Sequence, residues 1–64
     1  MEEKRFDVVI CSDETGEVVS VIGTNLNEIQ MERRIETGLL RIDCSRYHVK
    51  EVSAGSCKVG DIAR

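Results

Sequence analysis

Residues 24–38, TNLNEIQMERRIETG, constrain the fold most, because no other stretch is delimited clearly enough to predict a helix. Asn25 or Thr24 is expected to cap the first turn, with Glu28 completing a capping box. Gly38 is expected to end the helix as a residue with positive φ. The chain before this segment is then expected to form a hairpin, and the chain after it a return strand and a tail.

The apolar residues of this helix fall on two sides. Met31, Ile35 and Leu39 lie one turn apart on one stripe, whereas Leu26 and Ile29 lie on another. A single apolar stripe is typical of a helix that packs on one neighbour. The two-sided pattern predicts packing on a sheet and on a second subunit.

The chain before the helix predicts an antiparallel hairpin. Residues 6–11, FDVVIC, are rich in the β-branched residues that favour strands, and residues 17–22, EVVSVI, continue the pattern. Residues 12–16, SDETG, supply turn formers between them. Gly23 is expected to end the second strand.

The chain after the helix predicts one more strand. Residues 46–53, RYHVKEVS, alternate in the way expected of a strand, while residues 39–43 form either a short strand or a loop. Tyr47 and Val49 share one face of the third strand. The other face takes His48, Lys50 and Val52.

This order, β-β-α-β, predicts a two-layer α+β domain, an antiparallel hairpin plus a third strand with one helix on one face. The domain is expected over residues 1–53, followed by a flexible C-terminal tail over residues 54–64 that orders only on a partner. The second sheet face then has nothing in the chain to cover it. The apolar residues expected there are Val9, Cys11, Val18 and Ile22, or their neighbours of opposite pleat. A homo-oligomer, most simply a dimer, is expected to cover them.

Length and composition point the same way. A core built from 64 residues with two aromatic side chains is marginal by itself, and oligomerisation is a common remedy. Three cysteines without a CxxC pair argue against a disulfide framework and a zinc site. The longest apolar run has four residues, so no membrane span is expected, and we expect the cytoplasm of a cell as the location. The glycines match no phosphate or dinucleotide loop, so no cofactor is expected.

The charges divide along the chain. Residues 1–32 carry two basic and eight acidic residues, a net charge of −6, whereas residues 33–50 carry five basic and two acidic residues, a net charge of +3. Such a division fits either an ordinary solvated surface or two working faces of opposite charge.

Two candidate binding faces follow. The acidic face consists of Asp13, Glu14 and Glu17, at or beside the hairpin tip, and would bind a protein with a basic surface. The basic face would bind an anionic nucleotide or contact nucleic acid, because arginine forks suit phosphates and tyrosine stacks on bases. Its members are Arg33, Arg34, Arg41, Arg46, Tyr47, His48 and Lys50.

Catalytic chemistry is not expected. His48 is the one histidine, and the nearby Ser45 and Ser53 lack a recognisable base and orienting group. Cys44 is interpreted as an idle loop thiol. The acids of residues 13–17 lack the longer ligand series of a calcium loop, so no metal site is expected.

Three stretches resemble small uncharacterised proteins of phages and prophages: FDVVICSDETGEVV, ERRIETGLL and RYHVKEV. The resemblance covers about residues 6–52. It departs after Gly38, where LLRIDCS replaces an Asn-rich run of that group. What it implies is a non-enzymatic accessory protein of a phage, acting by binding in the host cytoplasm.

Two functions therefore stand as hypotheses. The first is an oligomeric inhibitor that uses the acidic face to block a host defence or nucleic-acid-processing protein. The second is an oligomeric binder that uses the basic face to sequester an anionic nucleotide signal or to contact nucleic acid.

Overall fold

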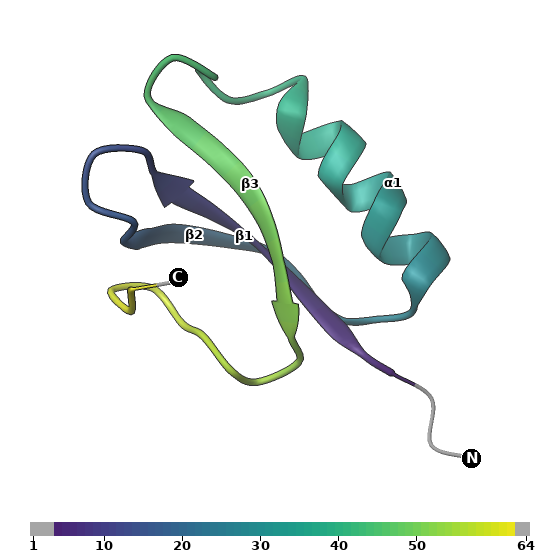
Figure 1. Cartoon of the computed structure of the whole chain (residues 1–64). Helices are drawn as coiled ribbons and strands as arrows, with labels where there is room; N and C mark the ends of the chain where they lie inside the picture. Colours follow the sequence, from purple (N-terminus) through teal and green to yellow (C-terminus); the bar gives the residue numbers. More distant parts are fainter. Residues whose placement is uncertain (1–3, 63–64) are drawn as a thin grey trace.

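The computed structural model describes residues 4–62 and confirms the predicted α+β fold (Figure 1). The elements are β1 (Phe6–Ser12), β2 (Val18–Leu26), α1 (Glu28–Leu39) and β3 (Tyr47–Ser53). The strands form one antiparallel sheet in the order β2-β1-β3, with α1 on one face.

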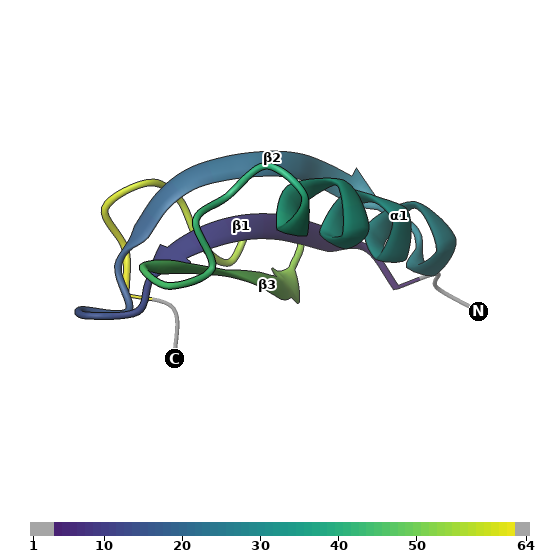
Figure 2. The ribbon, with the colours of Figure 1, turned by 90° about the horizontal axis from the view of Figure 1, so that it is seen from above.

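The central strand β1 pairs differently with its two neighbours. Its register with β3 is regular from Phe6–Ser53 to Ser12–Tyr47. Its register with β2 shifts three times, between Phe6 and Val8, between Val8 and Val9, and between Ile10 and Cys11. Bulges of this kind bend a strand and increase its twist. The sheet is accordingly curved, as Figure 2 shows for β2.

The helix begins later than the sequence predicted. Asn27, not Thr24 or Asn25, is the N-cap, and it forms a capping box with Gln30 instead of Glu28. The Asn27 Oδ1 accepts from the Gln30 N–H at 2.8 Å, and the Gln30 Oε1 accepts from the Asn27 N–H at 3.2 Å. The prediction failed because β2 does not end at Gly23, which pairs with Val8.

Gly38 is inside the helix, so its predicted role as a positive-φ cap was wrong. The C-cap is Leu40, in the right-handed α region. Gly38 is instead buried, where a Cβ would lie 2.7 Å from the Ile22 Cδ1 and 3.1 Å from the Val49 Cγ2. The missing side chain lets α1 approach the sheet. Residues 40–43 form a turn, so the strand alternative for residues 39–43 was also wrong.

The helix side of the sheet holds one part of the core. Val8 is fully buried there, and Met31 is the buried side chain of α1. Ile29 and Leu39 are exposed on the helix surface. Ile29 belongs to the second predicted side and Leu39 to the first, while Leu26 lies in β2 and not in the helix. The predicted contact of the helix with a second subunit stays a prediction.

The opposite side of the sheet is covered from within the chain, so the prediction that it lies bare was wrong. Val9, Cys11 and Val18 are at most 1% exposed there, with Cys57 packed against them. Ile22, predicted to share this face, points toward Gly38 on the helix side. An uncovered sheet face therefore no longer supports a dimer, although the oligomeric state itself stays a prediction.

The segment over residues 54–62, predicted as part of a flexible tail, curves back beneath β1 toward the start of β2 (Figure 1). The Val18 N–H donates to the Asp61 carbonyl at 2.7 Å, and the Gly60 N–H donates to the Val18 carbonyl at 2.9 Å. Glu17 and Ile62 form an antiparallel bridge. These bonds place the segment on the sheet, whereas its mobility stays a prediction. Residues 63–64 lie outside the described residues.

Asp7 fixes both ends of this arrangement. It is the buried acidic residue of the described chain, 5% exposed, and its carboxylate accepts two backbone hydrogen bonds. One comes from Asn25 at 2.9 Å and the other from Gly55 at 2.9 Å. Both donors have positive φ, 52° at Asn25 and 77° at Gly55, a conformation that asparagine and glycine tolerate best.

We predict that Gly38→Val lowers the free energy of unfolding by about 1–3 kcal/mol, because the added atoms overlap Ile22 and Val49. Urea unfolding measures the change. Leu40→Ala, on the exposed C-cap residue, is the control and should change the free energy by at most about 0.5 kcal/mol. An unaltered midpoint for Gly38→Val would contradict the close approach.

We also predict that Asp7→Ala lowers the free energy of unfolding by about 2 kcal/mol or more, because two backbone N–H groups lose a charged acceptor. Asp7→Asn keeps one acceptor oxygen, so its free energy of unfolding should lie between those of the unaltered protein and Asp7→Ala. Slowed hydrogen exchange at the Asn25 and Gly55 amides should disappear together in Asp7→Ala. Exchange that persists at both sites would contradict this role.

Candidate functional site

The hairpin tip, defined as residues 12–17, is held by short-range hydrogen bonds. The Ser12 N–H donates to the Glu17 carbonyl at 2.9 Å, and the Gly16 N–H donates to the Ser12 carbonyl at 2.8 Å. The Ser12 Oγ accepts from Glu14, and the Thr15 Oγ1 accepts from Glu17. Serine and threonine hydroxyls often close turns in this way. The acidic residues therefore sit on a defined backbone.

Asp13 joins the hairpin tip to β3. Its Oδ1 lies 2.5 Å from the Nδ1 of His48, and its N–H donates to the Arg46 carbonyl at 2.9 Å. An ionised carboxylate only accepts, so the imidazole donates its Nδ1–H in this contact. Both side chains are more than 40% exposed, so the pair contributes little to stability.

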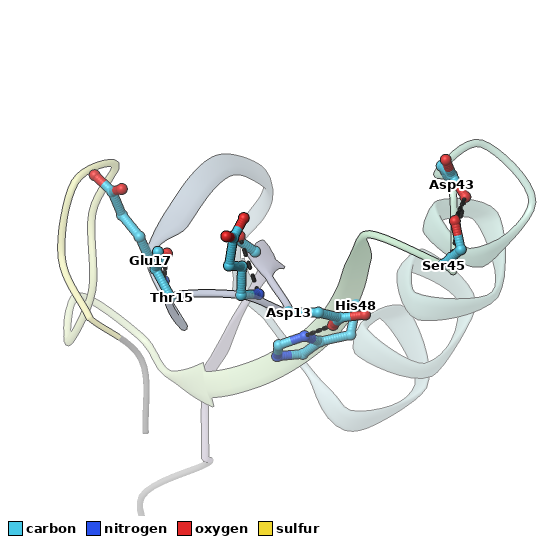
Figure 3. A network of polar contacts seen from close by, with 8 residues as sticks. Asp13, Thr15, Glu17, Asp43, Ser45 and His48 are labelled. Carbon is cyan, nitrogen blue, oxygen red and sulfur yellow. Dashed lines mark hydrogen bonds and ion pairs between the residues drawn. The ribbon is translucent and has the colours of Figure 1, made fainter.

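The three residues of the predicted acidic face do not converge. Asp13 faces His48, whereas the Glu17 carboxylate is directed away from that pair (Figure 3). Asp13 and Glu14 line an open hollow of about 530 Å³ together with Arg46. Arg46, which the sequence analysis assigned to the basic face, therefore lies beside the acidic hairpin tip.

The turn before β3 is held by Asp43. Its Oδ1 accepts from the Ser45 hydroxyl at 2.6 Å and from the Ser45 N–H at 3.0 Å. The hydrogen bond from the hydroxyl, followed by the one from the backbone, lowers the pKa of the Asp43 carboxyl. Arg46 lies 4.0 Å from the second carboxylate oxygen, and both side chains are mostly exposed.

A groove between the end of α1 and β2 is the second surface, called here the helix–strand groove. Its first hollow, of about 310 Å³, has Arg34, Thr37 and Arg41 on its wall. The remaining lining is supplied by Ile10, Ile22, Gly38 and Ile42. Its second hollow, of about 260 Å³, shares Arg41 with the first and continues to Tyr47 and Val19.

The structure therefore divides the predicted basic face. Arg34, Arg41 and Tyr47 meet along the helix–strand groove. Arg33 lines a separate hollow, of about 270 Å³, with Gln30, Arg34 and Thr37 on α1. Arg46 belongs to the hollow beside the hairpin tip.

The other two residues of the predicted basic face, His48 and Lys50, lie across the sheet from the groove. They pair with Cys11 and Val9, the residues of the opposite core. The alternation of β3 already placed His48 and Lys50 on the face opposite Tyr47, and this part of the sequence analysis is confirmed.

Sequence reasoning missed two features of these surfaces. The Asp13–His48 contact joins residues 35 positions apart, and its signal is the β1–β3 register, which places His48 opposite Cys11. The apolar floor of the groove needs Ile42, which belongs to the segment left open between strand and loop. No local pattern marks either feature.

Comparison of the chain with protein-family models, with curated proteins and with solved structures finds no match in any of the three. Among residues 4–62, no helix has the length and apolar character needed to cross a membrane. The same residues contain no group of three or more histidine, cysteine, aspartate or glutamate side chains arranged to hold a metal ion.

We predict that the Asp43 carboxyl titrates below its usual value of 3.8 and that Ser45→Ala raises its pKa toward that value. Since the folded-state pKa is lowered, the ionised carboxylate stabilises the fold above the unfolded-state pKa. This contribution disappears as the pH falls through the folded-state pKa. NMR titration of the carboxyl carbon measures the shift, with Ser53→Ala as the control. An unchanged titration in Ser45→Ala would contradict the assignment.

Proposed function

We propose that the protein is a non-enzymatic accessory binding protein that holds an anionic partner in the helix–strand groove. The observation that supports this proposal is the placement of Arg34 and Arg41 on the wall of a groove with an apolar floor. The assignment to a phage, with action in the host cytoplasm, rests on the resemblance over residues 6–52.

The chemistry of the groove explains why a partner should be anionic. A guanidinium group forms paired, charge-assisted hydrogen bonds with carboxylates and phosphates. Such bonds are stronger where neighbouring apolar surface excludes water, and Ile10, Ile22 and Ile42 supply that surface here. Each hollow is near the lower end of the size range of ligand pockets.

A nucleotide is one anionic partner that this chemistry accommodates. Tyr47 and Val19 line the second hollow, where a base would find apolar contact, while Arg34 and Arg41 would meet the phosphates. A dimer that joins two grooves would enlarge the site. Both remain proposals for this chain.

The second candidate function is inhibition of a host protein with a basic surface through the hairpin tip. The hydrogen bonds within residues 12–17 favour it, because a fixed loop loses less conformational freedom on binding. Two observations weaken it: Asp13 already contacts His48, and Arg46 shares the hollow beside the tip. Glu14 and Glu17 are the exposed acids that would act.

We predict that Arg34→Ala and Arg41→Ala each weaken binding of an acidic probe at least about tenfold, since each removes a charge-assisted hydrogen bond. Poly-glutamate, ATP and inorganic polyphosphate are the probes, followed by NMR titration of the backbone amides. Arg33→Ala is the matched control, because Arg33 is an exposed neighbour on the same helix that does not line the groove.

The same titration separates the two candidate functions. Glu14→Lys with Glu17→Lys should leave binding of the acidic probes in the groove intact. Poly-lysine that binds the unaltered protein and fails on this double variant would support the hairpin tip instead. Equal affinity of all three arginine variants for the acidic probes would contradict the groove.

A further inference from the structure

The outer edge of β2 is only partly paired. β2 is an edge strand of the sheet, with β1 as its neighbour on one side (Figure 2). On the other side, the segment over residues 60–62 bonds to Glu17 and Val18 at the start of the strand. In the described part of the chain, the edge over residues 19–24 has no neighbouring strand.

This edge lacks two common protections against further pairing, although the β1–β2 pair contains bulges. Natural edge strands are often blocked by charged residues or proline, or are kept very short. β2 has nine residues, and its sequence VVSVIGTNL contains neither a charge nor a proline. The bonds to Gly60 and Asp61 also show that the same edge accepts a chain segment at its first residues.

The helix–strand groove lies beside this edge. A Cβ on Gly23 would lie 3.1 Å from the Cγ and 3.4 Å from the Nε of Arg34, so the arginine side chain lies directly over β2 at that residue. Arg41 lines the hollow that includes Val19 and Ser20, nearer the start of the strand. The two arginines therefore border β2 at separate points along its length.

We infer that the partner in the helix–strand groove is an extended polypeptide segment that adds to β2 as a fourth strand. Successive side chains of a strand point to opposite faces of a sheet. On the helix side, apolar side chains of the added segment would lie beside Ile22 and Ile42, and flanking carboxylates would meet Arg34 and Arg41. Recognition by strand addition combines main-chain hydrogen bonds with side-chain pockets in this way. The inference rests on the proposed function and names the partner class for the same site.

The groove favours a polypeptide over a nucleotide. Its two hollows follow one another along β2 and share Ile10, Arg41 and Ile42, which gives an elongated surface. Isoleucine and valine supply four of its eleven lining residues: Ile10, Val19, Ile22 and Ile42. An extended chain uses this length and also satisfies the edge hydrogen-bonding groups of β2, which a nucleotide leaves unpaired.

The test uses a synthetic peptide, Glu-Thr-Val-Thr-Val-Thr-Glu, whose one face presents two valines between two glutamates. A second peptide has the same sequence with alternate backbone amides N-methylated, in both possible phases. A third peptide has lysine in place of glutamate. We expect the first peptide to bind, to slow hydrogen exchange at the amides of residues 19–24, and to lose at least about tenfold in affinity in Arg34→Ala.

The three kinds of peptide separate the contribution of backbone hydrogen bonds from that of side-chain charge, without altering the protein. N-methylation in one phase should abolish binding, since it removes donors and adds bulk at the edge, and the lysine peptide should not bind. Equal binding of both N-methylated peptides, with the arginine dependence intact, would overturn strand addition and leave the proposed function standing. ATP or polyphosphate binding without peptide binding would overturn the inference in the same way.

Two further outcomes complete the experiment. Peptide binding that protects residues 19–24 but is insensitive to Arg34→Ala and Arg41→Ala would contradict the proposed function and keep the strand edge. Absence of peptide binding to the unaltered protein, at concentrations where the NMR spectrum shows it folded, would overturn the inference outright.

Discussion

The buried carboxylate of Asp7 is the interaction on which the rest of the fold depends. It accepts backbone hydrogen bonds from Asn25, at the end of β2, and from Gly55, in the turn after β3. One side chain on the central strand thereby fixes where the helix can begin and where the last segment turns back. The turn directs residues 56–62 onto the sheet face that holds Val9 and Cys11. A chain of 64 residues obtains two covered sheet faces in this way, although it has one helix.

The predictable part of the fold was the part with local patterns. The β-branched run after Phe6 and the alternation before Ser53 predicted two strands within one residue of their observed limits. The sequence analysis interpreted Gly23 as the end of a strand and Gly38 as the end of the helix. In the structure both are positions where a side chain would overlap close neighbours, so the predicted helix limits were wrong. The covering of the second sheet face depends on the bond between Asp7 and Gly55, 48 residues apart, and no local pattern announces it.

The candidate site shows the same limit. The sequence analysis grouped seven residues in the basic face, yet the sheet separates them. Arg34 and Arg41 line one hollow because the last turns of α1 lie over Ile10 and Ile22, whereas His48 lies across the sheet beside Asp13. Period-two alternation was sufficient to divide Tyr47 from His48. Placing Arg34 over Gly23 requires the helix position, which depends on Asn27 and Gly38.

The return of the last segment to β2 also determines the order in which the molecule can fold. The β1–β2 hairpin and α1 involve neighbouring parts of the chain, whereas the Glu17–Ile62 bridge closes a loop that includes β2, α1 and β3. Closing a long loop costs more conformational entropy than closing a short one, and contacts between distant residues slow folding. We therefore expect Cys57 to join the cluster around Cys11 only when residues 57–62 have returned to the sheet. During synthesis, that half of the core waits until residues 57–62 have left the ribosome.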